Sequence, residues 1–518
     1  MAPTFEKRKM RKFNIILSAF LAEFLLIIFS GSNHVQARAV ASWSPDKQVP
    51  GYRDETFTPF LVADQNRTVH AFASQWVGTG DRRHAVVYRQ WSLNSGWTRP
   101  VDIILSPISN GRSDFLSALL DSTGNLHVIF MSGDTPNTAI YYSSAPAVLA
   151  DSALVWSLPV MVAEGASGIN SAAMVGDDQG TLVIIYSGNI DGNGVYSVSS
   201  SNAGITWTKP SPVFLTDDTT LLPFSLRMVM GPDRNARAVW NVVTNLGVDE
   251  SLYFANYDMQ AAEWGIPVEL DTRIDLPDYF GPSFPALVDN GKEIVVVYNG
   301  GNPFAGRPVN PGRPIQRVRV STNGGQTWNE PLDPFPFHVG RSGEHTLALD
   351  GNGAPHTLFI QRIESIDEEG DYNLIGGIWH SAFQNGVWTN PDRFVTTVPA
   401  HDVRSIVVQG NVLLAVWRED PGSGESGIWY SYSVLDIPEL PVVPFSTIPA
   451  VTSGETDATA IPFSIAPTPL PDESIFDLAP PSNLGTNPAL SIILGVIPVL
   501  LVLVVVLFGY QLFLKRRK

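Results

Sequence analysis

Hydrophobic and polar positions between residues 43 and 436 alternate in short runs and lack helical spacing. Apolar runs such as TPFLVAD, SAAMVGD and FPALVDN are each followed by a second run, such as TVHAFAS, TLVIIYS and EIVVVYN, and in most copies by a third. Runs of this length, rich in Val, Ile, Tyr and Phe and bounded by Gly, Pro, Asn and Asp, are typical of strands joined by turns. The pattern therefore predicts an all-β region.

The units repeat along the chain. Six of them end in Trp, two residues and Pro, at intervals of 51 to 64 residues. These tryptophans are Trp97, Trp156, Trp207, Trp264, Trp328 and Trp388. Seven units open near Pro59, Phe115, Ser171, Leu226, Phe284, His345 and Arg404. Four strands repeated with this period predict the blades of a seven-bladed β-propeller, with the Trp-Pro segment as the fourth strand.

The last unit, which ends near residue 436, lacks its own Trp-Pro segment. A spare copy, SWSPDKQVP, stands before the first unit and begins at Trp43. We predict that this N-terminal segment supplies the missing strand of the last blade. The ring would then close without free sheet edges, which otherwise invite aggregation.

Two copies of one phrase, SSNAGITW and STNGGQTW, precede Trp-Pro segments. They resemble the Asp-box, S-x-D-x-G-x-T-W, of sialidases and related propellers with bacterial-neuraminidase repeats, with Asn in place of Asp. The resemblance implies a structural hairpin turn between the third and fourth strands of a blade. The matching residues are Ser200, Asn202, Gly204, Thr206, Trp207, Ser321, Asn323, Gly325, Thr327 and Trp328.

The same resemblance suggests exo-α-sialidase activity and, as the alternative to seven blades, the six-bladed sialidase ring. Active members of that family place an Arg-Ile-Pro motif at the start of the first blade, where this chain has Thr58-Pro59. Whether the protein is an enzyme is therefore left open, and we assign no catalytic residue.

The two ends of the chain carry targeting patterns. A basic cluster, the apolar run 13–29 and the tripeptide VQA predict a signal peptide over residues 1–37, with an uncleaved signal anchor as the alternative. Residues 489–514 contain no charge and are followed by the basic tail 515–518, which predicts a transmembrane helix with a cytoplasmic tail. Residues 437–488, rich in Pro, Ser and Thr, predict a stalk between this helix and a propeller of residues 38–436.

Composition excludes several classes of function. The 518 residues carry a net charge of −17, and the part outside the basic termini is more acidic still, so a nucleic-acid partner is not expected. The chain contains no cysteine, which excludes disulfides and thiolate metal sites and, for an exported protein, favours a bacterial surface. The nine histidines lack metal-ligand spacing, and the acidic run 367–371 is interpreted as a solvated loop rather than a calcium site. We expect no cofactor, no metal and a monomer.

Loops that enter the innermost strands of a propeller converge on one mouth of its central channel, and here those loops are polar. The candidate ligand-binding residues at this mouth are Arg53, Asp54, Glu55, Trp76, Arg112, Asp114, Arg227, Asp278, Tyr279, Arg341, Glu344, Asp402 and Arg404. Arginines can clamp an anionic sugar, carboxylates can act as acid or base, and Trp76 can stack on a pyranose. The alternative is that these charges pair with one another at a solvated rim, and that Trp76 packs in the core.

Three functions fit the sequence. The favoured one is a single-pass protein of the cell membrane whose external propeller binds glycans or another cell-envelope ligand at the channel mouth. The second is a glycoside hydrolase, for example an exo-α-sialidase. The third is a protein-interaction scaffold without a small-molecule site.

Overall fold

The structure is a computed structural model that describes residues 42–52, 56–77, 83–108, 112–134, 137–164, 171–275, 279–301, 315–335, 340–366, 372–384, 386–396, 400–419, 427–443 and 445. Contacts divide the chain into Met1–Thr447 and Ile448–Lys518, and all described residues belong to the first unit. No helix within the described ranges has the length and apolar character needed to cross a membrane. The predicted signal peptide and transmembrane segment lie outside these ranges.

Seven antiparallel sheets follow one another along the chain, each starting with its innermost strand. Blade 1 contains β2 (Phe60–Ala63), β3 (Val69–Val77), β4 (Arg83–Ser92), β5 (Gly96–Trp97) and β6 (Val101–Leu105). Blade 2 contains β7 (Arg112–Leu120), β8 (Asn125–Asp134), β9 (Asn137–Pro146), the short 3-10 helices η1 (Ala147–Leu149) and η2 (Ala153–Val155), and β10 (Val160–Glu164). Blade 3 contains β11 (Ala172–Gly176), β12 (Leu182–Gly188), β13 (Gly194–Ser200) and β14 (Ser211–Leu215).

The remaining four sheets continue the series. Blade 4 contains β15 (Leu221–Met230), β16 (Ala236–Thr244), β17 (Asp249–Asp258), β18 (Glu263–Trp264) and β19 (Val268–Thr272). Blade 5 contains β20 (Phe280–Asp289), β21 (Ile294–Gly301) and β22 (Ile315–Ser321). Blade 6 contains β23 (Gly340–Leu349), β24 (Pro355–Ile366), β25 (Tyr372–Gln384), β26 (Val387–Trp388) and β27 (Asp392–Val395). Blade 7 contains β28 (Ala400–Val408), β29 (Val412–Glu419), β30 (Gly427–Val434) and β1 (Lys47–Gln48).

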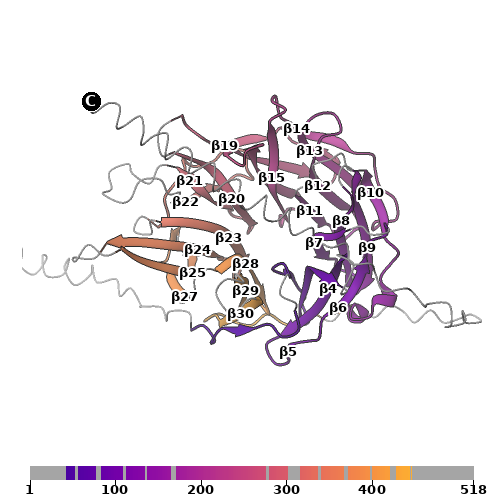
Figure 1. The fold of residues 1–518 in the computed structure, drawn as a ribbon, viewed down its shortest axis with the longest axis horizontal. Coiled ribbons are helices and arrows are strands. Elements are labelled where there is room, and N and C mark those ends of the chain that lie inside the picture. Colours follow the sequence, from indigo (N-terminus) through magenta and orange to yellow (C-terminus); the bar gives the residue numbers. More distant parts are fainter. Residues whose placement is uncertain are drawn as a thin grey trace, which may run out of the picture. The chain divides into compact units, whose positions relative to one another are not determined.

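The sheets form a closed ring. Each innermost strand contacts the innermost strand of the next blade, and β28 of the last blade contacts β2 of the first. Figure 1 shows β7, β11, β15, β20, β23 and β28 around the centre of this ring. The all-β, seven-bladed propeller predicted from the repeat is thus confirmed, and the six-bladed alternative is wrong. All seven predicted openings fall in an innermost strand or directly before one.

The N-terminal segment closes the ring as predicted. Lys47 and Gln48 of β1 pair antiparallel with Tyr430 and Trp429 of β30, which places β1 at the outer edge of blade 7. Trp43 adds a further bridge to Ser433 in the same direction. The edge of β30 is therefore covered by a segment almost 400 residues earlier in the chain, and the two ends of the propeller are held in one sheet.

The fourth strand does not lie where the Trp-Pro motif was expected to put it. Trp97, Trp264 and Trp388 fall in two-residue strands, and the longer outer strands β6, β19 and β27 begin after the Pro. In blade 5 the segment after the Trp makes only one bridge, between Val318 and Leu332, within the described residues. The motif therefore turns the chain into the outer strand rather than forming it.

The two Ser-Asn-Gly-Thr-Trp turns have the same geometry. Ser200 Oγ accepts the backbone N–H of Gly204 at 2.9 Å, and Asn202 Oδ1 accepts that of Thr206 at 2.9 Å. The Trp207 ring lies 5.3 Å from the ring of Tyr142 in blade 2, so the turn packs against the preceding blade. Asn therefore supplies the acceptor that the turn needs.

The second copy repeats these contacts. Ser321 accepts from Gly325 and Asn323 from Thr327, both at 2.9 Å, and the Trp328 ring lies 4.9 Å from that of Phe254 in blade 4. Both glycines have positive φ, and a Cβ on either would lie 2.3 Å from the neighbouring blade's aromatic ring. Glycine is required there by backbone conformation and by close packing together.

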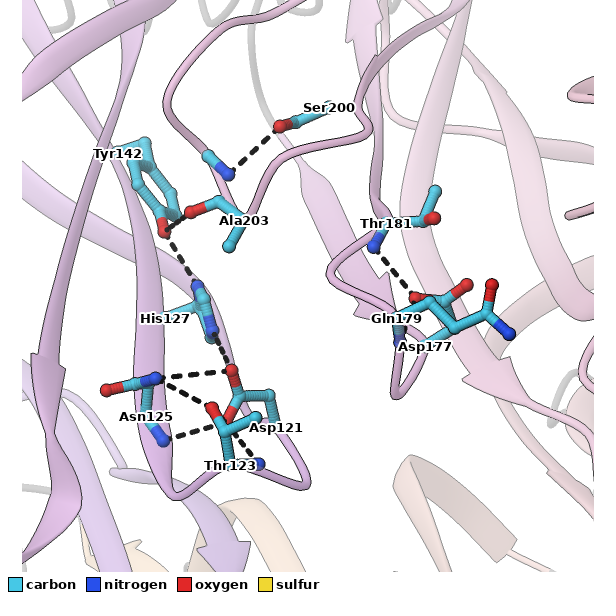
Figure 2. A network of polar contacts seen from close by, with 11 residues as sticks. Asp121, Thr123, Asn125, His127, Tyr142, Asp177, Gln179, Thr181, Ser200 and Ala203 are labelled. Atoms are coloured by element: carbon cyan, nitrogen blue, oxygen red, sulfur yellow. Dashed lines mark hydrogen bonds and ion pairs between the residues drawn. The ribbon is translucent and has the colours of Figure 1, made fainter. Parts of the chain in front are cut away.

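Histidines link the turns on the opposite end of the blades from the mouth. In blade 2, Asp121 accepts the backbone N–H groups of Thr123 and Asn125 and also contacts His127 Nε2 at 3.1 Å. His127 Nδ1 contacts the Tyr142 hydroxyl at 2.7 Å, and that hydroxyl donates to the carbonyl of Ala203 in blade 3, as Figure 2 shows. Burial alone would raise the pKa of Asp121, but the hydrogen bonds from His127 and the turn lower it to about 2.

The same arrangement recurs in other blades. His70 lies between Asp64 and Tyr88, and His356 between Asp350 and His380. His70, His127 and His356 are each at most 3% exposed. We conclude that they are structural links between turns and strands, which agrees with their treatment as ordinary residues.

The chain continues across this turn face after the ring ends. Leu440 N donates to Gln409 O at 2.8 Å in blade 7, and Val443 N donates to Gln65 O at 3.2 Å in blade 1. Phe445 packs against the core between blades 1 and 2. The first residues of the predicted stalk, 437–443 and 445, which we call the strap, therefore contact three successive blades.

The innermost strands share an irregularity near the mouth. The pairing register shifts in β7, β15, β20, β23 and β28, in each case within the first seven residues of the strand. Three non-glycine residues in these bulges, Ser225, Phe284 and Asp402, have φ near +50°. Bulges redirect side chains and often occur next to functional sites. These bulges therefore indicate that a functional site lies at the mouth of the channel.

Candidate functional site

A cavity of about 440 Å³ opens at the mouth between blades 1, 2 and 7. It lies at the end of the innermost strands opposite the strap. Its lining combines apolar and charged side chains: Phe57, Thr58, Phe60, Ala73, Ser74, Arg112, Asp114, Phe115, Leu116, Met131, Asp402 and Arg404. We call this cavity the mouth pocket. Four of the predicted site residues, two on blade 2 and two on blade 7, line it together.

Blade 2 contributes an arginine and a carboxylate from the start of β7. Arg112 Nη2 lies 3.2 Å from Asp114 Oδ2, and the Arg112 side chain is 54% exposed, so its guanidinium can reach a ligand. The other Asp114 oxygen is hydrogen-bonded to Nδ1 of His84, which comes from β4 of blade 1 and is buried. Two partners thus fix the orientation of the Asp114 carboxylate, which borders the pocket.

Blade 7 contributes the opposite side through the bulge of β28. Asp402 Oδ2 lies 3.7 Å from Arg418 Nη2, a weak ion pair with a side chain of β29. The Arg418 guanidinium also lies 5.9 Å from the centre of the Phe57 ring, and Phe57 is 44% exposed at the pocket edge. Arg404 has no carboxylate within 4 Å among the described residues.

Two further predicted residues lie beside Arg404. Burial and the positive charge of Arg404 lower the pKa of Arg227, in the bulge of β15, to about 10, although Glu344 opposes this. Burial raises the pKa of Glu344, in the bulge of β23, to about 7; the positive charge of Arg404 opposes the rise, and the negative charge of Asp402 adds to it. Oε2 of Glu344 is buried without a hydrogen-bond partner in the described structure. Glu344 is therefore a buried carboxyl group with a raised pKa that interacts with the charges of Arg227 and Arg404.

The other predicted residues are placed differently. The Trp76 ring lies 3.7 Å from that of His84 and does not line the mouth pocket. The Tyr279 hydroxyl accepts a hydrogen bond from Arg317 at 3.0 Å and also lies away from the pocket lining. Arg341 belongs to β23, but its side chain is not described, and Arg53, Asp54, Glu55 and Asp278 lie outside the described residues.

Sequence reasoning missed three residues of the site. His84 and Arg418 belong to a third and a second strand, and their mouth-facing ends lie next to innermost-strand residues of other segments. Phe57 precedes β2 and was not considered. The register between β28 and β29 would have indicated that Arg418 lies near the site, because its partner His401 is one residue from Asp402. Nothing in the local sequence around His84 indicates its bond to Asp114.

A second cavity, of about 350 Å³, lies between blades 6 and 7 near Trp43. Its Asp350, His356 and His380 side chains bond to one another, so they serve the fold. Across the residues that the structure describes, no group of three His, Asp or Glu side chains is arranged to hold a metal ion. In the mouth pocket, by contrast, Arg404 lines the cavity without a carboxylate within 4 Å in the described structure.

Comparisons with known proteins give no assignment. No family model matches the chain, and no curated protein sequence matches it. Similar solved structures include an ulvan lyase of a new polysaccharide lyase family, at 11% identity over 75% of this chain and 96% of that one, with a TM-score of 0.48. They also include the Trypanosoma rangeli sialidase, at 12% identity over 76% of this chain and 60% of that one, with a TM-score of 0.41. At these values the function must be argued from the site itself.

Proposed function

We propose that this protein is a carbohydrate-binding propeller that takes an anionic glycan, one with carboxylated or sulfated sugars, in the mouth pocket between blades 1, 2 and 7. One observation carries the proposal: Arg112 and Arg404 approach one cavity of about 440 Å³ from opposite sides. This volume is within the usual range for small-molecule sites and can hold one or two sugar rings.

The charge around the pocket favours an anion. The described arginines at or next to it are Arg112, Arg227, Arg404 and Arg418, and the carboxylates are Asp114, Glu344 and Asp402. Since the pKa of Glu344 is raised to about 7, this carboxyl is partly neutral at neutral pH, which leaves the arginines in excess. A local positive field in a chain of net charge −17 is what recognition of an anion requires.

The remaining lining fits a sugar. Phe57 presents an exposed ring at the pocket edge, and apolar ring faces of pyranoses pack on aromatic side chains. Thr58 and Ser74 supply hydroxyl groups that can donate to or accept from sugar hydroxyls. A scaffold without a small-molecule site would have its mouth charges paired, whereas neither Arg227 nor Arg404 has a carboxylate within 4 Å in the described structure.

We further propose that the propeller is displayed on the outside of a cell membrane. This rests on the sequence of residues 1–37 and 489–514 alone. The strap lies on the turn face, opposite the mouth pocket.

Binding to polysaccharides of known charge tests the proposal. Purified full-length protein is titrated with polygalacturonate, a sulfated galactan and neutral dextran, and binding is measured by calorimetry at two salt concentrations. We expect binding to at least one anionic polymer, none to dextran, and about tenfold weaker binding or worse for Arg404→Ala and Arg112→Ala, the loss expected from a charge-assisted contact.

Arg273→Ala is the matched control. Arg273 is similarly exposed and paired with Glu250 at 3.1 Å, but it follows the outer strand β19 of blade 4, away from the mouth pocket. Its substitution should leave binding unchanged. Equal binding by the Arg404 and Arg273 variants, or equal binding of dextran and the anionic polymers, would contradict the proposal.

A further inference from the structure

One histidine lies behind the mouth pocket without lining it. His84 belongs to β4, the third strand of blade 1, and its side chain is 1% exposed. Its Nδ1 is hydrogen-bonded to Oδ1 of Asp114 in blade 2, and because a carboxylate only accepts hydrogen bonds, Nδ1 donates. The other ring nitrogen, Nε2, is buried and has no hydrogen-bond partner in the described structure. The bond to Asp114 is therefore the polar contact that explains a buried histidine at this position.

Aromatic neighbours hold the imidazole ring of His84. The Trp76 ring lies 3.7 Å from it, and Trp76 is also its pairing partner in β3. The Phe57 ring meets it edge-on at 6.2 Å. Side chains packed in this way are confined to one rotamer. The N–H group of His84 therefore points in a fixed direction, and it fixes the oxygen of Asp114 that accepts from it.

The second oxygen of Asp114 transmits this order to an arginine. Oδ2 of Asp114 lies 3.2 Å from Nη2 of Arg112, whose side chain is 54% exposed, whereas that of Asp114 is 17% exposed. An exposed ion pair usually contributes little, because two flexible side chains must be held in one geometry. Here the carboxylate is already held by His84, so only the arginine has to be ordered. The Arg112 guanidinium is thus positioned at the pocket before a ligand binds.

We propose that His84 is a positioning residue of the mouth pocket: it does not touch the ligand, but through Asp114 it orients Arg112 toward the anionic glycan. This rests on the proposed function. An arginine that is ordered in advance spares the entropy of ordering a long side chain when the ligand binds. The saving corresponds to about three- to tenfold in affinity.

Three substitutions of His84 test the role, with calorimetric binding of polygalacturonate and of the sulfated galactan to the full-length protein as the measurement. His84→Phe keeps a buried ring but removes the donor, so binding should be about three- to tenfold weaker. His84→Asn should restore most of this loss, because its amide nitrogen takes the place of Nδ1. His84→Gln should not, because its amide nitrogen takes the place of Nε2.

A double-mutant cycle separates positioning from a general effect on the fold. In the Arg112→Ala protein, His84→Phe should weaken binding by no more than about twofold further, because the side chain that it positions is absent. A merely structural role would give the same loss in both backgrounds. The matched control is His127→Phe, since His127 is also buried and bonded to an aspartate, Asp121, but at the turn face (Figure 2). It should lower the melting temperature and leave binding unchanged.

The outcomes separate this inference from the proposed function. If His84→Phe binds an anionic polymer as well as the wild type does, or loses as much affinity with Arg112→Ala as without it, the positioning role is wrong and the binding function stands. If His84→Phe does not fold, equal binding by His84→Asn and His84→Gln overturns the role in its place. If the wild type binds neither polymer, both proposals are wrong.

Discussion

Closure of the ring by the N-terminal segment can be tested at a single side chain. The ring of Trp43 stacks on Phe394 of blade 6, with 3.7 Å between ring centres and 9° between planes, and its edge faces His380 at 5.5 Å. The same residue bridges to Ser433 of β30. Trp43→Ala therefore removes the contact that holds the closing segment against two blades, while its backbone pairing can persist.

The magnitude follows from burial. Replacing a fully buried Trp or Phe by Ala costs about 3–5 kcal/mol, and Trp43 is only partly buried, so we expect a loss of about 2–3 kcal/mol. Unfolding entropy is about 2.1 cal/mol/K per residue, which for a propeller of roughly 400 residues gives about 0.8 kcal/mol/K. The melting temperature should thus fall by about 3 °C.

Calorimetry of the full-length protein measures the shift, and hydrogen exchange localises it. In Trp43→Ala, amides of β30 that face the closing segment should exchange faster. Trp388→Ala, at a similarly packed position of blade 6, should destabilise the protein without that local change. If Trp43→Ala melts within 1 °C of the wild type and β30 exchanges as before, the closure inferred here is wrong.

Three further predictions concern the rest of the fold. Gly324→Ala should lower the free energy of unfolding by about 1 kcal/mol, because of its positive φ alone. Gly325→Ala should lower it by about 2–4 kcal/mol, because the new Cβ would also lie 2.3 Å from an aromatic ring. Equal losses in urea unfolding would contradict this. Burial lowers the pKa of His345 to about 3, whereas a His in the unfolded chain titrates near 6.5. Below pH 6.5 the unfolded chain therefore binds more protons than the folded chain, and the free energy of unfolding falls. Between pH 7 and pH 5 this residue should contribute a loss of about 2 kcal/mol that is missing in His345→Leu, and parallel stability profiles of the two proteins would refute it. A chain that ends at residue 436 should be less stable and more readily cleaved by protease than one that ends at residue 447, because it lacks the strap; identical cleavage rates would show that the strap adds nothing.

The blade count and the closing strand could be predicted because they depend on local signals. Apolar runs mark the innermost and second strands, and in the second strands β12 and β21 every residue is buried. The turns between them use Asp, Asn and Gly at fixed places. The spare Trp43 segment then followed from counting, since six terminal motifs were available for seven units.

The outer strands could not be placed in the same way. In β14 none of the five residues is buried, and in β10 only Val162 and Ala163 are. Without an apolar face there is no periodic signal, and their pairing depends on the strand beside them. The Trp-Pro motif was conspicuous enough to be mistaken for the strand that it precedes. The strap was missed for a related reason: a Pro-rich segment that binds through backbone groups looks like a linker.

The mouth could be predicted but not the sector of the mouth that forms a pocket. The loops that enter the innermost strands are polar in sequence, and the sequence does not distinguish the seven entrances. The structure distinguishes them through contacts between blades, such as His84 of blade 1 with Asp114 of blade 2. These pairs join residues that no local pattern relates.

The bulges explain how a symmetric ring presents an asymmetric site. Five innermost strands share the register shift, yet the side chain at the bulge differs from blade to blade: Ser225 and Phe284 carry no charge, whereas Asp402 carries a carboxylate that lines the mouth pocket. A positive φ is costly for any residue with a Cβ, and such strain persists only where the surrounding structure holds it. The fold therefore supplies the strained position several times, and the residue placed on it decides what chemistry that sector can perform. Asp402, which lines the mouth pocket and pairs with Arg418, is the bulge residue that brings a charge to this site.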